Sequence, residues 1–193
     1  MSRRAGLLVL AALVACPVAA DEPGSDEVAA AWKRQEVDFV YMGFTTLYSC
    51  GGLRSKVKLL LKHLGVRPDI KITERGCEYG FAKVADWPHL KIVFYVPEIP
   101  EVGARDVGEP VLGVWKPVSI GRHSPRGLEW GDCELVEQFR DRVLSKMPVR
   151  SMAGDVNCIP HQLIGNRIDL RFEILTGYVP ADAVQSAAQN NAP

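Results

Sequence analysis

Two stretches of the chain carry the apolar spacing of an amphipathic α-helix, and each begins at a cysteine. The apolar positions are Leu53, Leu60, Leu61 and Leu64 after Cys50, and Val136, Val143, Leu144 and Met147 after Cys133. Intervals of seven, eight and eleven residues place these side chains on one face of a helix. Gly65 and Pro148 follow at equivalent positions, and both residue types end helices. The pattern predicts two helices that pack one face on a sheet.

Six other segments have the character of β-strands. They are 37–42, 70–73 and 90–96 in the first half of the chain, and 115–120, 149–158 and 168–174 in the second. The last segment alternates apolar and polar side chains most regularly, which is typical of a strand with one buried face. Pro117 interrupts the segment 115–120, and this favours an edge strand because proline cannot donate to a ladder of hydrogen bonds.

The two halves therefore repeat the same order of strand, helix, strand and strand. Val66-Arg67 and Val149-Arg150 also lie sixteen and seventeen residues after the first cysteine of their own half, with no gap. We expect an α+β fold of two tandem repeats, with a mainly antiparallel sheet and the helices on one face. The predicted units are 34–98 and 111–178, joined by a surface connection over 99–110.

The first twenty residues resemble a secretory signal. Arg3 and Arg4 precede an apolar run over 5–15, and small residues lead to a cleavage site between Ala20 and Asp21. We expect a flexible segment over 21–33 and a disordered tail over 179–193. An alternative is a lipoprotein signal acylated at Cys16, which would anchor the chain to the envelope. No apolar run reaches the roughly 20 residues of a transmembrane helix.

Composition narrows the class of protein. The 193 residues include 23 Lys and Arg and 23 Asp and Glu, and the apolar fraction of 47% is that of a globular domain. Removal of the signal would leave a formal charge of −2, because two arginines go with it. A nucleic-acid-binding protein usually has a basic excess, so this class of partner is disfavoured.

Four cysteines remain after the signal, and in an oxidising compartment they predict two disulfides. A helix of about 15 residues is about as long as a returning strand of about seven. The cysteine that opens each helix should therefore meet the one that closes the next strand. We expect the bonds Cys50–Cys77 and Cys133–Cys158, each within one half.

The sequence contains no strong motif for catalysis or for metal binding. There is no Cys-x-x-Cys, so a redox role is disfavoured. Cys158 and His161 have a spacing compatible with metal ligation, but His63, His89 and His123 would have to complete the site. Gly121 to Ser124 contains a His and a Ser without a catalytic motif, and the helix carboxylates Glu134 and Glu137 are typical of solubilising charges. We therefore assign no catalytic, cofactor-binding or metal-ligating residue.

The segment 37–44 is apolar on both faces and is typical of a contact surface, which we expect between the two halves. The favoured function is a non-catalytic binding or structural module, periplasmic or secreted, with an envelope protein as a possible partner. The alternatives are a periplasmic enzyme with catalytic residues on the loops 43–49, 78–88 and 121–132, or a lipoprotein anchored at Cys16. Membrane contact is expected only with that lipid anchor.

Overall fold

The computed structural model describes residues 27–76, 84–85, 87–101, 103 and 108–178. The first half contains β1 (Glu27–Val40), α1 (Cys50–His63), β2 (Lys71–Arg75) and β3 (His89–Glu98). The second half contains β4 (Pro110–Gly121), the 3₁₀ helix η1 (Trp130–Asp132), α2 (Cys133–Arg142), the 3₁₀ helix η2 (Leu144–Lys146), β5 (Val149–Asn157) and β6 (Arg167–Tyr178). Each half has the predicted order of strand, helix, strand and strand.

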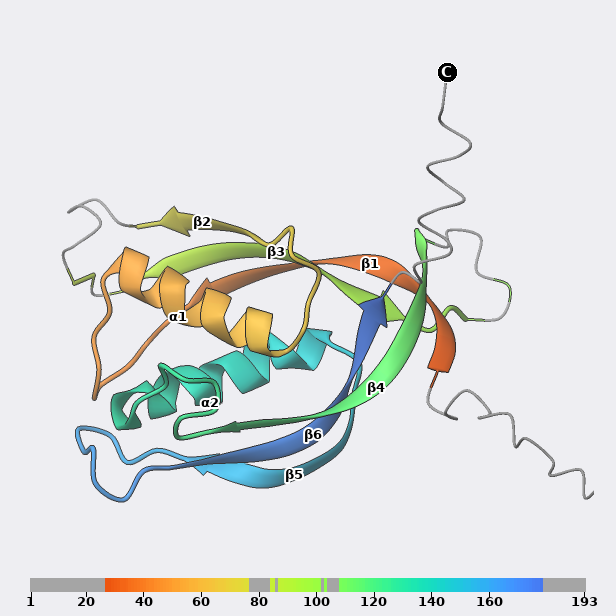
Figure 1. Cartoon of the computed structure of the whole chain (residues 1–193). Coiled ribbons are helices and arrows are strands. Elements are labelled where there is room, and N and C mark those ends of the chain that lie inside the picture. The colour runs from red at the N-terminus through yellow and green to blue at the C-terminus, as the bar shows by residue number, and fades with distance from the viewer. Residues whose placement is uncertain (1–26, 77–83, 86, 102, 104–107, 179–193) are drawn as a thin grey trace, which may run out of the picture.

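The strands form one antiparallel sheet of six, in the order β2-β3-β1-β4-β6-β5 (Figure 1). β1 joins two groups of three strands because it changes partner along its length. Its residues 31–40 pair with β3, and its residues 27–31 pair with β4. The sheet bends between the two groups, and both helices lie on its concave side (Figure 1).

α1 ends at the predicted terminator Gly65, whereas α2 ends at Arg142, six residues before Pro148, and η2 follows in that interval. Ser49 caps α1, its Oγ accepting a hydrogen bond from Gly52 N at 3.1 Å. At the other end, Val66 N donates to Leu61 O and Gly65 N donates to Lys62 O. Gly65 has φ of 71°, so this is the Schellman motif that glycine favours. None of the described helices combines the length and apolar character needed to cross a bilayer.

A continuous apolar core lies between the sheet and the two helices. All eight helix positions predicted from the spacing after Cys50 and Cys133 are buried in it. The inward side chains of β3 and β6 complete it: Leu90, Ile92, Phe94 and Val96, and Ile168, Leu170, Phe172 and Ile174. The two halves therefore share one core instead of each folding around its own.

The prediction of an edge strand at Pro117 is wrong, because β4 lies between β1 and β6. The register explains how a central strand accepts the proline. The described part of β1, which begins at Glu27, pairs with β4 as far as Val114, whereas Pro117 lies opposite Glu173 on β6. Pro117 is thus three residues beyond the last described β1 pair, so its missing N–H interrupts no hydrogen bond between β4 and the described part of β1.

Several expectations concern residues at the limits of the description. β1 begins at Glu27, so the segment expected to be flexible, 21–33, overlaps this strand. Pairing with β4 orders the alanine-rich start of β1, and Ala30 is buried beside Val111 and Leu175. The signal peptide with Cys16, Ala20 and Asp21, the tail 179–193 and Cys77 lie outside the described residues.

Candidate functional site

The polar face of α2 binds the backbone of the segment that follows β1. Glu134 Oε2 accepts hydrogen bonds from Phe44 N at 2.8 Å and from Thr45 N at 2.9 Å. One turn later, Gln138 Oε1 accepts from Met42 N and Gln138 Nε2 donates to Met42 O. The expectation that Glu134 is an exposed solubilising charge is therefore wrong: its side chain is buried against the other half of the chain.

Arg142 extends this row by one more turn, its guanidinium donating to Val40 O at 3.0 Å. Residues at intervals of four lie on one face of a helix. Glu134, Gln138 and Arg142 therefore bind the backbone of one extended segment, residues 40–45. The expected contact of segment 37–44 with the other half is thus present. Glu137, on the neighbouring face, is partly buried, and this burial raises the pKa of its carboxyl group.

A buried carboxylate, Asp132, connects α1 to the start of α2. It accepts a hydrogen bond from Tyr48 Oη and pairs with Lys56 Nζ at 2.7 Å. Lys56 Nζ also donates to Gly127 O at 2.5 Å. Burial, with the hydrogen bond to Asp132, raises the pKa of Tyr48 far above its usual range. Tyr48 therefore stays neutral as a donor, and the network acts as a structural tie between the halves.

Tyr41 packs edge-on against Tyr48 and donates to Thr46 O at 2.8 Å. Burial is the main cause that raises the pKa of Tyr41 above its usual range, and the charge of Glu134 adds to it. Two neutral tyrosines, each with a hydrogen-bond acceptor, are poor bases at neutral pH. This cluster fixes the conformation of residues 41–48 and presents no activated nucleophile.

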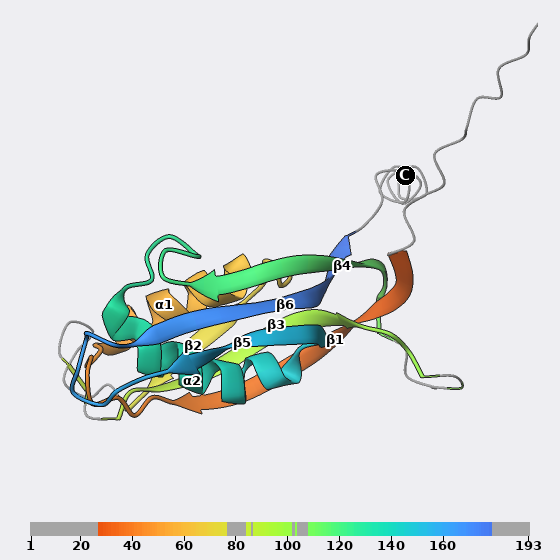
Figure 2. The same ribbon diagram turned by 90° about the horizontal axis from the view of Figure 1, so that it is seen from below.

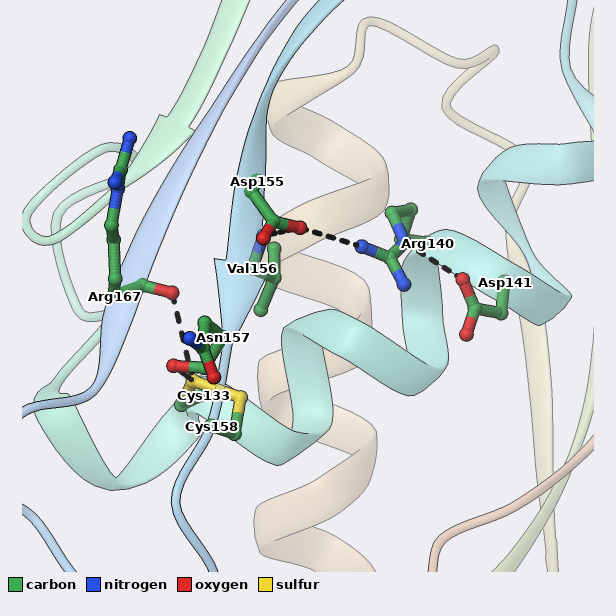
Figure 3. Close-up of polar contacts among 8 residues, drawn as sticks. All are labelled: Cys133, Arg140, Asp141, Asp155, Val156, Asn157, Cys158 and Arg167. Atoms are coloured by element: carbon green, nitrogen blue, oxygen red, sulfur yellow. Dashed lines mark hydrogen bonds and ion pairs between the residues drawn. A yellow bond between two sulfur atoms is a disulfide. The ribbon is translucent and has the colours of Figure 1, made fainter.

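The disulfide Cys133–Cys158 is confirmed, with a Cα–Cα distance of 5.6 Å (Figure 3). It joins the first residue of α2 to the end of β5, as the length match predicted. The Cys133 residue is completely buried, which disfavours attack by an external thiol. Cys50, at the first residue of α1, is also disulfide-bonded. Its expected partner, Cys77, lies outside the described residues.

The histidines considered for a metal site have separate surroundings. His63 Nε2 lies 2.8 Å from Ser119 O on β4, and His89 pairs with Asp38. The ring of His161 lies 5.5 Å from that of Phe44 in a tilted arrangement, and Cys158 is held in its disulfide. Among the residues that the structure describes, no three His, Cys, Asp or Glu side chains come together in a group that could hold a metal ion.

Three connections lie together at one end of the molecule, at the left of Figures 1 and 2, and each of them carries exposed apolar side chains. We call this surface the apolar end, and it consists of Phe44, Leu47, Trp130, Ile159, Leu163 and Ile164. The connections are those between β1 and α1, between β4 and α2, and between β5 and β6. Ile164 is 90% exposed and Phe44 is 65% exposed, which is unusual for side chains of this size.

Contacts between the three connections hold the apolar end together. The ring of Phe44 meets that of His161. Gly131 lies so close to Thr46 and Leu163 that a Cβ at this position would be 2.3 Å from Thr46 Oγ1 and 3.6 Å from Leu163 Cδ2. These contacts place two of the loops suspected from the sequence, 43–49 and 121–132, side by side. Most of the third loop, 78–88, lies outside the described residues.

Sequence reasoning missed the connection 158–166. Its apolar residues Ile159, Leu163 and Ile164 have no strand or helix period, and a position beside Phe44 depends on the fold alone. Asn166 folds this connection: it is buried, accepts from Ile159 N at 2.7 Å and donates to Gln162 O at 2.8 Å. The available signal was the dipeptide Gly165-Asn166 after Pro160, because these three residue types favour turns.

A shallow hollow of about 360 Å³ lies elsewhere, along β4, β5 and β6. Ser119, Arg171 and Glu173 line it, together with Ser151 at the bulge of β5. Arg150 holds the pKa of the Glu173 carboxyl below its usual range by a hydrogen bond at 2.8 Å. The hollow contains none of the tyrosines or the buried carboxylates described above.

Comparison of the chain with protein-family models, with curated proteins and with solved structures finds no match.

Proposed function

We propose that this protein is an exported, non-catalytic binding module that attaches to its target through the apolar end. The observation that carries this proposal is the gathering of six large exposed apolar side chains on three connections. Soluble surfaces rarely expose apolar side chains together unless a partner covers them. The connections are held in place by buried hydrogen bonds, so little order has to be gained on binding.

The polar groups near the apolar end support a binding role over a catalytic one. Asp132 is occupied by Tyr48 and Lys56, and Glu134 is occupied by the backbone of Phe44 and Thr45. A general base needs an available lone pair near a bound substrate. These carboxylates instead hold in place the connections that carry the exposed apolar side chains.

The disulfide between Cys133 and Cys158 supports a periplasmic or secreted location, because such bonds persist in oxidising compartments. The signal-like residues 1–20 support the same proposal. We expect the intact mass of the exported protein to give Asp21 as its first residue. A lipid-modified chain that begins at Cys16 would instead favour the lipoprotein alternative.

We further propose that the two halves are tandem repeats related by an approximate twofold axis. Cys50 and Cys133 define an offset of 83 residues between equivalent positions. With this offset, Glu27 is equivalent to Pro110, and Ala31 is equivalent to Val114. The register pairs Glu27 with Val114 and Ala31 with Pro110, so the two pairs exchange, as a twofold relation requires.

Two arginines support the same repeat. Arg67 and Arg150 are equivalent at this offset, and so are Trp32 and Trp115. Arg67 lies 5.4 Å from the ring of Trp32, and Arg150 lies 4.3 Å from the ring of Trp115. Each arginine thus lies over the tryptophan of its own half, and Arg67 lies closer still to the ring of Tyr95, at 3.9 Å. The match extends from the first strand of each half to the strand that follows the helix.

The proposed function can be tested by sedimentation of native envelopes with the exported protein. We expect the affinity of the double variant Phe44→Ser/Ile164→Ser for the envelopes to be at least tenfold weaker, while its melting temperature stays unchanged. Ile99→Ser/Met152→Ser is the matched control, because both residues are about half exposed and lie outside the apolar end. Equal binding by the two variants would contradict the proposal. An activity lost in a folded Lys56→Met variant would favour the enzyme alternative.

A further inference from the structure

We propose that the apolar end inserts into the interfacial region of a membrane that contains anionic lipids. This inference rests on the proposed function and names the target of the same surface. It also departs from the expectation that membrane contact would need acylation at Cys16. The insertion needs no spanning segment, because side chains on connections enter only the outer part of one leaflet.

The shape of the apolar end favours lipid over a folded partner. Its side chains come from three connections that converge at one end, instead of from the flat face of a sheet or the stripe of a helix. Ile164, at the turn between β5 and β6, is the most exposed of them. A bilayer accepts protruding side chains without a complementary surface, and burial of each Leu or Ile is worth about tenfold or more in partition.

Trp130 has the surroundings of an aromatic residue at a membrane interface. Its indole is exposed, and the guanidinium of Arg122 lies 4.5 Å from its ring. Tryptophan prefers the depth of the lipid headgroups, where its ring is among apolar groups and its N–H is hydrated. At that depth, a stacked guanidinium can reach lipid phosphates while the indole stays in contact with acyl chains.

The charges on the connections of the apolar end favour an anionic surface. Arg122 and Arg126 are exposed on the connection between β4 and α2, and Glu129 is the exposed carboxylate of the same connection. At the ends of the neighbouring strands, Arg167 pairs with Asp169 at 3.8 Å, and Asp155 pairs with Arg140 at 3.6 Å. Asp132 and Glu134 are buried and already paired. The connections therefore expose two positive charges against one negative charge, and an anionic leaflet attracts such an excess.

The framework beneath the apolar end is already rigid. The Cys133–Cys158 disulfide and the Asn166 hydrogen bonds hold the connection that carries Leu163 and Ile164. The row on α2 holds the connection that carries Phe44. Insertion therefore needs no rearrangement of the core, and wild-type protein should bind without a change in its secondary structure.

The test is sedimentation of the full exported chain with vesicles of phosphatidylcholine, with or without 30% phosphatidylglycerol (about the anionic content of a charged leaflet). We expect binding to be at least tenfold tighter with phosphatidylglycerol and to weaken at high salt. Leu163→Ser/Ile164→Ser should weaken it tenfold or more, and Arg122→Gln/Arg126→Gln should remove most of the preference for anionic lipid. Ile99→Ser/Met152→Ser is the control, and all variants keep the same N-terminus. Melting temperatures confirm that each variant is folded.

Two results would overturn the inference. One is the absence of binding to anionic vesicles, and the other is equal binding by the Leu163→Ser/Ile164→Ser variant and the control. If native envelopes still bind through the apolar end while vesicles do not, the target is an envelope protein. The proposed function would then stand without the lipid inference. If neither envelopes nor vesicles bind, both proposals fail.

Discussion

The connections after β1 and after β4 both lie on the helix of the other half, but they are held by different chemistry. The connection after β1 is bound by hydrogen bonds from Glu134, Gln138 and Arg142 to its backbone. The connection after β4 lies on α1 mainly through Gly127, where a Cβ would be 3.2 Å from Leu59. Lys56 adds the single hydrogen bond to Gly127 O.

In the proposed repeat, the residues of α1 that correspond to Glu134, Gln138 and Arg142 explain this difference. At the offset of 83 they are Gly51, Ser55 and Leu59, none of which has a carboxylate or a guanidinium. The same arrangement of helix and strand therefore uses side-chain hydrogen bonds on one side and close packing at a glycine on the other. The position of each connection thus follows from the fold, whereas the interactions that hold it depend on a few helix residues.

The largest expected effect tests whether α1 and the 3₁₀ helix η2 that follows α2 contribute equally to the core. Leu61→Ala and Leu144→Ala should each lower the free energy of unfolding by about 2–5 kcal/mol, because both side chains are completely buried in one cluster. Denaturant titration measures both values. A cost below about 1 kcal/mol for either variant would show that its helix is not an equal part of the core.

The next effect concerns the tie on the side of α1. Asp132→Ala should cost about 3 kcal/mol, because Tyr48 Oη loses its acceptor and Lys56 Nζ loses its charge partner while it still donates to Gly127 O. The double variant Lys56→Met/Asp132→Ala should cost less than the sum of the single variants. Asp141→Ala, which removes an exposed carboxylate next to Arg140, is the control and should change stability by less than about 0.5 kcal/mol. Additive costs would mean that Asp132 and Lys56 act independently.

A smaller effect should separate the two connections directly. Glu134→Ala should cost about 1.5–3 kcal/mol, because Phe44 N and Thr45 N lose a charged acceptor. Ser55→Ala on α1 should cost less than about 0.5 kcal/mol, since Ser55 Oγ donates only to Gly51 O within its own helix. Hydrogen exchange should become faster at Phe44 and Thr45 in the first variant only. Unchanged exchange there would contradict the role given to Glu134.

The smallest expected effect tests the repeat through its two stacked arginines. Arg67→Lys and Arg150→Lys should each cost about 0.5–1 kcal/mol, because lysine lacks the planar group that lies over the tryptophan. Tryptophan fluorescence should change in both variants, since Trp32 and Trp115 lose the same neighbour. An effect in only one half would weaken the proposed equivalence of the two positions.

Local patterns in the sequence predicted the elements well, because each pattern depends on a few neighbouring residues. The spacing after Cys50 and Cys133 gave both helices, and the Gly65 terminator is realised as a Schellman motif. The pairing of Cys133 with Cys158 followed from element lengths alone. These features need no knowledge of which strands are neighbours.

The candidate site was less predictable because it depends on contacts between distant segments. Glu134 has the sequence environment of an exposed helix residue, and only the strand lying on α2 buries it. Pro117 predicted an edge strand, but β4 lies between β1 and β6. The described pairing of β4 with β1 ends before Pro117, so this part of a central strand can accept a proline as an edge strand does. Ile164 belongs to the apolar end only because the β5–β6 turn lies beside the connection that carries Phe44, and the sequence does not predict that contact.

The hydrogen bond between Tyr178 Oη and Glu27 Oε1, at 2.6 Å, has a consequence for the order of the two halves. It brings the end of β6 next to the start of β1, so a short linker could join them. The chain could then be opened in the connection between β3 and β4, and a circular permutant would begin with β4 and end with β3. Such a permutant keeps every strand pair of the sheet. We expect it to fold to the same structure, with the second half synthesised first.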